Sequence, residues 1–419
     1  MTYQQAIDWL YELRLLGSKL GLENPRRLAA LAGNPQGRLK IIHVAGTNGK
    51  GSVCAMLECI YRAQGYKTGL FTSPHLVSFR ERIQVNREWV SKEDIIQQVG
   101  EMQMRLEQFP EGQTPTFFEV ITVMALEYFA QCECDIVLLE TGLGGRLDAT
   151  NIVNPTATVI TPIDLDHQQY LGETLPEIAM EKAGIIKPST PAFCANQQAS
   201  VTEVIERVAQ EREAPCVLVA KGETDTALPG RHQRENATLA KVVAEGAGLT
   251  VSSESILRGL QEVQWQGRLE CVEKGRQKFI IDAAHNPAGA QALADFLQEI
   301  FPGQRPALLI GVLADKNWKY TVELLSPLVS CIVCVPVGSE RGLAPSELAT
   351  FVHQHCESVQ SCDSLTEGLE KMGEEPLVVV AGSIYLIGEA MEQLGLVEPA
   401  RERGLNDWQI FNPKVKAGQ

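Results

Sequence analysis

The segment KIIHVAGTNGKGSVCAMLECI, residues 40–60, decides the fold class of this chain. Its first residues form an apolar, β-branched run that is typical of a buried strand. A glycine-rich turn, GTNGKGS at 46–52, follows directly. Apolar residues then recur at helical spacing, at Val53, Met56, Leu57 and Ile60. A strand, a glycine-rich loop and a helix in this order predict a phosphate-binding loop in an α/β domain.

The composition of the turn supports this interpretation. Glycine lets backbone N–H groups approach phosphate oxygens, the helix N-terminus adds a favourable dipole, and Lys50 supplies a point charge. The strict Walker pattern requires Gly at position 44 and Ser or Thr at position 51, whereas the chain has Val44 and Gly51. The alternative is a plain glycine turn. The predicted nucleotide-binding residues are Thr47, Asn48, Gly49, Lys50, Gly51 and Ser52, with Ser52 and Thr47 able to reach a metal or a phosphate oxygen.

Further apolar runs alternate with amphipathic segments, as expected for parallel sheets with crossover helices. The predicted strands lie at 40–46, 68–73, 134–142, 156–163 and 190–196, and a second series lies at 278–285, 306–313, 330–337 and 376–383. The polar stretch VQWQGRLE, residues 263–270, separates the two series as a hinge. We therefore expect a P-loop parallel-sheet ATPase domain over 1–264, followed by a smaller Rossmann-like α/β domain over 265–419.

Composition excludes several classes of function. The chain has 419 residues, with 37 Lys plus Arg against 52 Asp plus Glu, and this net charge of −15 opposes a broad nucleic-acid surface. The N-terminus lacks the pattern of a signal peptide, and the apolar runs are too short to span a bilayer, so a cytoplasmic protein is expected. The eleven cysteines are expected to be reduced thiols; for the pair Cys331 and Cys334, core packing is favoured over a zinc or redox role.

Three other motifs place polar residues near the expected loop. Glu140 begins ETGLGGRLDATN at the end of an apolar strand, where an acid can hold magnesium on a triphosphate. His167 follows the next strand in DLDHQQYLG; taken alone, it is better explained as a structural hydrogen-bonding group than as a magnesium ligand. Lys182 lies in the otherwise apolar segment IAMEKAGIIKP, where a semi-buried lysine either loses its proton or pairs with an acid such as Glu140.

Eight motifs in order then give a specific resemblance. They are GTNGKGS (46–52), TSPHL (72–76), TFFE (116–119), ETGLGGRLDATN (140–151), LDHQQYLG (165–172), EKAGIIK (181–187), GRLE (267–270) and DAAHNP (282–287). Together they resemble the folylpolyglutamate synthase/dihydrofolate synthase family, which belongs to the Mur-ligase superfamily of ATP-dependent amide-forming ligases. The resemblance covers nearly the whole chain.

The resemblance implies a role for individual positions. Lys50 would contact the nucleotide phosphates, and Ser73, Glu140 and His167 would hold magnesium. Lys182 would be carbamylated and would bind a second magnesium ion. Asn236 would reach the adenine and Arg268 the phosphates, while Asp282 and His285 would close over the nucleotide from the second domain.

The reaction implied is transfer of the γ-phosphoryl group of ATP to a carboxylate, followed by attack of the amine of L-glutamate on the acyl phosphate. Such a site mainly positions reactants and neutralises charge, so no protein nucleophile is needed. Lys50, Lys182 and His285 are the predicted catalytic residues, with His285 either contacting the nucleotide or acting as a base on the incoming amine. Cofactors would be ATP and two Mg²⁺ ions.

The acceptor site is expected at an aromatic wall. Thr116, Phe117 and Phe118 can stack on a flat pterin, with Arg146 and Asp148 orienting it; ordinary core packing is the alternative for the two phenylalanines. The segment LGSKLGLENPRRL, residues 16–28, resembles the bifunctional bacterial enzymes, which implies activity on both dihydropteroate and tetrahydrofolates.

Two other functions stay open at this point. One is a cell-wall Mur ligase, which is disfavoured because only 45 residues precede Gly46, where those enzymes carry a sizeable nucleotide-sugar domain. The other is a nucleotide-binding module without turnover. A monomer without nucleic-acid or membrane partners is expected.

Overall fold

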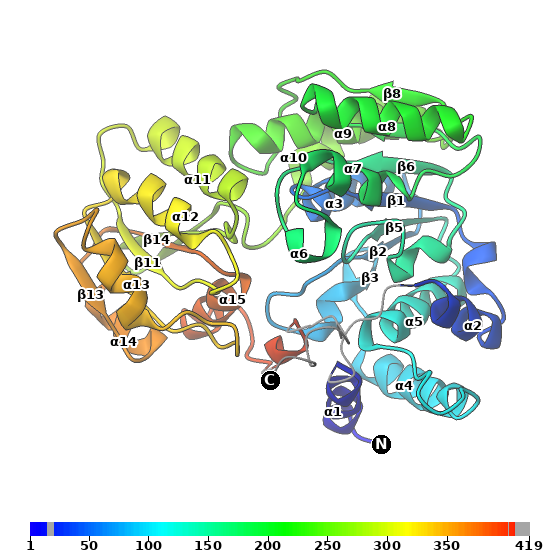
Figure 1. The fold of residues 1–419 in the computed structure, drawn as a ribbon, viewed down its shortest axis with the longest axis horizontal. Helices are drawn as coiled ribbons and strands as arrows, with labels where there is room; N and C mark the ends of the chain where they lie inside the picture. The colour runs from blue at the N-terminus through cyan, green and yellow to red at the C-terminus, as the bar shows by residue number, and fades with distance from the viewer. Residues whose placement is uncertain (15–20, 401, 407–419) are drawn as a thin grey trace.

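The computed structural model describes residues 1–14, 21–400 and 402–406 of the chain. These residues form two sheets, which lie in separate lobes (Figure 1). The mixed α/β class and the two-domain arrangement expected from the sequence are confirmed. The predicted boundary between residues 264 and 265 stays a prediction; it falls between the end of one helix at Glu262 and the start of a strand at Glu270.

The larger sheet has eight strands in the order β4-β3-β2-β5-β1-β6-β7-β8. Their bounds are β1 Ile41–Ala45, β2 Thr68–Phe71, β3 Ile83–Val85, β4 Glu88–Trp89, β5 Ile136–Glu140, β6 Ala157–Ile160, β7 Ala192–Cys194 and β8 Cys216–Leu218. The central strand β1 pairs in parallel with β5 and with β6. The loops after these three strands therefore leave the same edge of the sheet, which is where open α/β sheets bind ligands.

One edge of this sheet differs from the expected all-parallel arrangement. Strands β3 and β4 form an antiparallel hairpin, and β3 pairs antiparallel with β2. Asn86 and Arg87 both have positive φ in the two-residue turn, as tight hairpins require. The sequence prediction omitted these strands because they are only three and two residues long, too short for a visible period.

Helices cover both faces of the larger sheet, and alternate residues of β5 divide between two cores. Val137 and Leu139 pack with α1, α2, α4 and α5, while Ile136 and Leu138 pack with α3, α9 and α10. The helices of this lobe are α1 Tyr3–Arg14, α2 Glu23–Leu31, α3 Lys50–Ala63, α4 Lys92–Leu106, α5 Phe117–Gln131, α6 Gln168–Leu171, α7 Leu175–Ala183, α8 Ala199–Glu211, α9 Arg231–Gly246 and α10 Ser253–Glu262. Short 3-10 turns lie at η1 Pro35–Arg38, η2 Phe79–Arg82 and η3 Ala149–Ile152.

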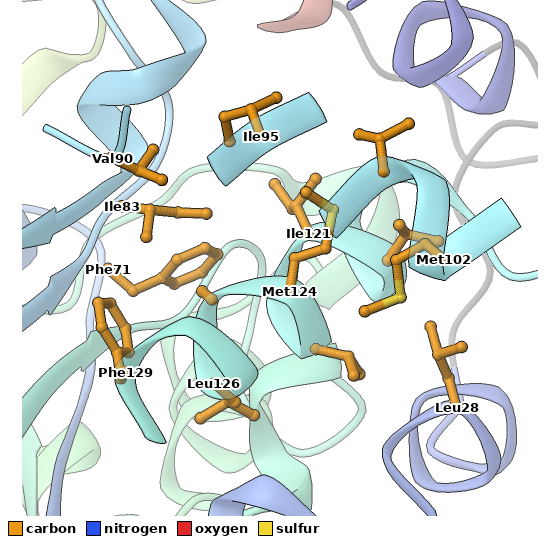
Figure 2. Close-up of a cluster of buried hydrophobic side chains, with 14 of the residues drawn as sticks. Leu28, Phe71, Ile83, Val90, Ile95, Met102, Ile121, Met124, Leu126 and Phe129 are labelled. Carbon is orange, nitrogen blue, oxygen red and sulfur yellow. The ribbon is translucent and has the colours of Figure 1, made fainter. Parts of the chain in front are cut away.

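The first of these cores fixes the helix that precedes β5. Figure 2 shows Ile121, Met124 and Leu126 of α5 packed among side chains from β2, α2 and α4, including Phe71. Helix α5 is apolar around most of its circumference, as a buried helix must be. Its N-terminal residues, and the carboxyl end of β5 beside it, are therefore held on a rigid base.

The smaller sheet has six strands in the order β13-β12-β11-β14-β10-β9. The bounds are β9 Glu270–Lys274, β10 Gln277–Ile281, β11 Ala307–Ile310, β12 Cys331–Cys334, β13 Val359–Ser361 and β14 Leu377–Ala381. Five strands are parallel, and β9 is antiparallel to β10 at the edge. The hinge expected at 263–270 therefore runs directly into an unpredicted edge strand.

The helices around this sheet are α11 Pro287–Ile300, α12 Trp318–Leu325, α13 Pro345–Val352, α14 Leu365–Lys371 and α15 Ile384–Gln393, with 3-10 turns η4 Ser326–Leu328 and η5 Arg403–Asn406. The last turn, η5, returns from the second lobe toward α1 of the first (Figure 1). Just before it, Glu402 accepts a hydrogen bond from Tyr3 at 3.2 Å.

The structure also bears on membrane association and on the state of the cysteines. Within residues 1–14, 21–400 and 402–406, no helix has the length and apolar character needed to cross a membrane. All eleven cysteines are free thiols, and Cys334 lies in the core of the second lobe.

Candidate active site

A cavity of about 550 Å³ lies between the two lobes, at the carboxyl ends of their central strands. Its size is typical of a small-molecule site. The lining includes these predicted site residues: Thr47, Asn48, Gly49, Lys50, Gly51, Ser52, Ser73, Thr116, Phe117, Phe118, Glu140, Asp148, His167, Lys182, Asn236, Arg268, Asp282 and His285. The topology thus gathers side chains that are far apart in the sequence around one space.

The glycine-rich turn adopts a conformation that needs glycine at two positions. Gly46 has φ +152°, and a Cβ there would lie 1.8 Å from the hydroxyl oxygen of Thr161. Gly49 has φ +85°, and its Cβ would lie 2.6 Å from the amide oxygen of Asn236. The backbone N–H of Thr47 donates to the carbonyl of Pro162 at 2.9 Å. The turn is thus fixed by the neighbouring loop after β6.

Lys50 and Ser52 begin helix α3 and differ in their surroundings. The Lys50 Nζ donates to the Thr47 carbonyl at 3.2 Å and lies 4.0 Å from a Glu140 oxygen. The Ser52 hydroxyl accepts a hydrogen bond from Gln233 at 3.2 Å, and Gln233 in turn accepts one from Asn236 at 3.1 Å. Asn236 is therefore tied to the phosphate loop through Gln233.

Glu140 lies at the end of β5, opposite Val44 in the parallel register. It is buried, and burial raises the pKa of its carboxyl group, an effect that nearby Lys50 opposes. One carboxylate oxygen accepts the N–H of Ser73 at 3.1 Å. Burial beside the glycine-rich turn disfavours the charged carboxylate of Glu140. A bound cation would favour that charged form, so the position of Glu140 suits an oxygen ligand for a cation.

The donor set is compatible with magnesium bound to a nucleotide. Mg²⁺ prefers oxygen ligands and usually takes one or two carboxylates, with substrate phosphates and waters completing its shell. Within the described part of the chain, no three His, Cys, Asp or Glu side chains cluster closely enough to enclose a metal ion. The site therefore fits an ion whose other ligands come from phosphate and water.

Lys182 comes from α7, whose capping box at Thr174 and Glu177 starts the helix. Its ammonium group is buried and donates to the Gly46 carbonyl at 2.7 Å. Burial, together with the charge of Lys50, lowers the pKa of Lys182 from 10.5 to about 7. The ion pair with Glu140, considered as the alternative, is not among the salt bridges of the described residues.

A group of charged side chains joins the lobes around Asp166. Lys316, from the loop after β11, lies 2.6 Å from the Asp166 carboxylate, and His285 Nε2 lies 3.8 Å from it. His167 lies 3.7 Å away, and its pKa is lowered to about 3, mainly by burial, so its imidazole is neutral. These contacts bring the predicted residues His167 and His285 to the same carboxylate.

The second lobe reaches the phosphate loop through its DAAHNP segment. Asn286 donates to the side-chain oxygen of Asn48 at 2.9 Å. Asp282 accepts N–H groups from Leu269 at 2.8 Å and Ala284 at 2.9 Å, so its carboxylate organises its own loop. Arg268 lines the cavity beside this loop.

The residues of the predicted aromatic wall line the cavity, and both phenylalanine rings also pack on the core. The centroid of Phe117 lies 6.2 Å from that of Phe79, and the centroid of Phe118 lies 6.0 Å from that of Phe71. Thr116 caps α5 through Glu119. Stacking and core packing, posed as alternatives, are thus compatible, because these side chains have one side on the core and line the cavity.

Two residues of ETGLGGRLDATN differ in position from the expectation. Asp148 accepts N–H groups from Gly142, Leu143 and Thr150 and so fixes its own loop. Arg146 lies outside the cavity lining: it is half exposed and pairs with Glu181 at 2.7 Å. The structure thus does not bring Arg146 to the other predicted site residues.

Several charged residues of the cavity wall were not predicted from the sequence, among them Asp166, Lys316 and Arg82. Asp166 is adjacent to the selected His167, and an acid at a strand end was a usable signal. Lys316 follows a predicted strand at its carboxyl end, which was a weaker signal. Arg82 lies in a turn without any motif.

Comparison with known proteins agrees with this geometry. Residues 44–228 match the Mur ligase middle domain, and residues 267–384 match the Mur ligase glutamate ligase domain. The dihydrofolate synthase/folylpolyglutamate synthase of Bacillus subtilis is 34% identical over 427 residues, which cover 94% of this chain and 99% of the relative.

Solved structures give the same result. Folylpolyglutamate synthase from Thermotoga maritima superimposes with a TM-score of 0.86 at 34% identity, covering 96% of this chain and 98% of that one. The Mycobacterium tuberculosis folylpolyglutamate synthase complexed with ADP and AMPPCP has a TM-score of 0.87 at 29% identity, covering 95% and 100%. The chain therefore belongs to the folylpolyglutamate synthase/dihydrofolate synthase family of the ATP-dependent Mur ligases.

Proposed function

We propose that this protein joins L-glutamate to tetrahydrofolates and to dihydropteroate, using ATP and passing through an acyl phosphate. The observation that carries the proposal is the cavity between the lobes, which has the glycine-rich turn on one side and the 282–286 loop on the other. The double name of the Bacillus subtilis relative supports activity on both acceptors. Part of the segment used to predict this dual activity, residues 16–20, lies outside the described residues.

In this proposal the phosphate loop binds the triphosphate. The N–H groups of the 46–52 turn and the start of α3 face the phosphates, and Lys50 neutralises charge as the γ-phosphoryl group moves. Asn236 is proposed at the adenine and Arg268 at the phosphates. His285 is proposed beside the nucleotide, since it is joined to Asp166 and Lys316 where the two lobes meet.

Glu140, with Ser73 and His167, would hold Mg²⁺, and the ion would neutralise the charge of the β- and γ-phosphates. The neutral imidazole of His167 suits ligation, because a protonated ring has no free lone pair. We further propose that Lys182 is carbamylated and serves a second ion. A neutral lysine amine adds CO₂ and releases a proton, and the lowered pKa of Lys182 keeps a large share of the amine neutral near pH 7.

The acceptor is proposed to lie against Thr116, Phe117 and Phe118, with its carboxylate toward Lys50 and Glu140. Phosphoryl transfer to that carboxylate makes phosphate a leaving group. The amine of L-glutamate then adds to the acyl carbon, and collapse of the tetrahedral species releases phosphate and forms the amide. The protein's contribution is alignment, which can remove about 7–11 kcal/mol from such a barrier.

A coupled assay of ADP release tests the proposal. With ATP, Mg²⁺ and L-glutamate present, we expect turnover that depends on added dihydropteroate or tetrahydrofolate. Release of ADP that does not depend on L-glutamate would contradict the proposal, and nucleotide binding without any ADP release would support the binding-module alternative. Monomeric state and cytoplasmic location stay predictions of the sequence.

A further inference from the structure

Among the residues that the structure describes, Arg82 is a buried cation of the cavity wall that forms no ion pair. Arg82, in the turn η2, is only 3% exposed and lines the cavity. Within the described residues, no carboxylate lies within 4.0 Å of its guanidinium. Lys316 and Arg341, which also line the cavity, do have acids, at 2.6 Å from Asp166 and 3.1 Å from Asp315.

Neutral groups hold the Arg82 side chain. Its Nε donates to Nδ1 of His75 at 2.8 Å, and one Nη donates to the side-chain oxygen of Asn406 at 2.7 Å. The ring of Phe117 lies on another side, with its centroid 5.5 Å from the guanidinium carbon. Among the described residues, the second Nη has no hydrogen-bond partner. The guanidinium is thus oriented by these contacts, and the charges of Glu81 and Glu140 act on it only at a distance, without forming an ion pair.

Residues distant in sequence maintain this arrangement. The Thr72 N–H donates to the Arg82 carbonyl at 3.1 Å and closes the base of the 73–81 loop. Asn406, beyond the second lobe, also donates to the His75 carbonyl at 2.7 Å. The C-terminal segment therefore crosses back to the first lobe and supports the loop that carries Arg82.

Burying a cation without an anion is costly, because the lost hydration is not replaced. A guanidinium binds carboxylates well, since its N–H groups match the two oxygens. Arg82 lines the cavity beside Phe117, within the proposed ligase site, so the inference rests on the proposed function. Both organic substrates of that reaction carry carboxylates.

We propose that Arg82 binds a substrate carboxylate in the cavity and that Asn406 is a positioning residue for its guanidinium. The ligand class is a carboxylate of either L-glutamate or the folate-type acceptor. The C-terminal turn η5 therefore completes the substrate site of the first lobe.

Initial rates of ADP release in the full chain test this assignment, with L-glutamate and the acceptor varied in turn. For Arg82→Gln we expect the KM of one carboxylate substrate to rise by about 10- to 100-fold, the value of one charge-assisted hydrogen bond, with the KM of ATP unchanged. A rise for L-glutamate assigns the amino-acid carboxylate, and a rise for the acceptor assigns the other source. Arg82→Lys keeps the positive charge but loses the paired N–H groups of the guanidinium. The KM of the same substrate in this variant should therefore lie between the values for the wild type and for Arg82→Gln.

Asn406→Ala keeps the charge of Arg82 and removes one hydrogen-bond acceptor from its guanidinium. It should raise the same KM by a smaller factor, with kcat retained. This variant remains informative if Arg82→Gln fails to fold. Arg80→Gln is the matched control, because Arg80 lies in the same turn, donates to the Val90 carbonyl and is outside the cavity lining. Unchanged KM values for both substrates in Arg82→Lys and Asn406→Ala would overturn the inference.

Calorimetric titration of L-glutamate and of dihydropteroate separates the inference from the proposed function. If the wild type binds one of these ligands and Arg82→Lys binds it more weakly, the carboxylate site is supported even without turnover. Equal affinity of the wild type and Arg82→Lys for both ligands refutes it.

Discussion

Replacing Gly49 by alanine should damage both the stability of the first lobe and its affinity for ATP. Gly49 has φ +85°, and the added Cβ would meet the Asn236 amide oxygen at 2.6 Å. A left-handed conformation costs an L-residue about 1–2 kcal/mol. Displacing Asn236 weakens its hydrogen bond to Gln233, which adds about 0.5–1.5 kcal/mol.

Gly65 provides a matched control just beyond the other end of the same helix, α3. It has φ +98°, and a Cβ there meets nothing within 4 Å. Gly65→Ala therefore carries the backbone strain alone. Each kcal/mol shifts the Tm of a domain of 150–250 residues by about 2–4 °C, so we expect Gly49→Ala to melt about 1–6 °C below Gly65→Ala.

Thermal unfolding and ATP titration measure the two effects separately. Gly49→Ala should lower Tm and weaken ATP binding, because the altered turn carries the N–H groups proposed to face the phosphates. Gly65→Ala should lower Tm with unchanged ATP affinity. Equal melting temperatures for the two variants together with unchanged ATP affinity in Gly49→Ala would refute the reasoning.

Three further predictions address other parts of the site. Lys182→Ala should remove turnover while leaving the fold intact by circular dichroism, and wild-type turnover in this variant would disprove the carbamate. Lys316→Met removes the lysine that lies 2.6 Å from the partly buried Asp166 carboxylate; we expect a lower kcat/KM for ATP, and an unchanged value would show that this inter-lobe ion pair does not contribute to the use of ATP. Burial lowers the pKa of His43 from 6.5 to about 3, so the unfolded chain takes up a proton below pH 6.5 that the folded chain does not. Stability should therefore fall by about 1.4 kcal/mol per pH unit from this group as the pH drops below 6.5, and denaturant titrations of His43→Gln should lack that part of the slope.

The sequence was most informative where several constraints coincided. The 40–60 segment combined an apolar run typical of a strand, a glycine-rich turn, and apolar residues at helical spacing. The structure has β1, the turn and α3 at these positions. Parallel topology then requires the ends of β5 and β6 to lie beside this turn, so Glu140 and His167 could be selected from their place after apolar runs.

Residues whose role depends on tertiary contacts were not predictable in this way. Arg82 stands out only in the folded protein, because it is buried and because it donates a hydrogen bond to Asn406, which is 324 positions away in the chain. Arg146 was selected because it lies in a motif, but the local turn directs it to Glu181 on the surface. Five short or edge strands, β3, β4, β8, β9 and β13, were missed because pairing with a neighbouring strand, and not hydrophobic period, defines them.

The central claim is that the triphosphate and its divalent ion bind in the cavity between the lobes, at the turn of residues 46–52. A crystal structure with a non-hydrolysable ATP analogue and Mg²⁺ tests it most directly. We predict phosphate density beside Lys50 and the ion within coordination distance of Glu140. Nucleotide bound at another surface, with this cavity lacking phosphate density, would contradict the account.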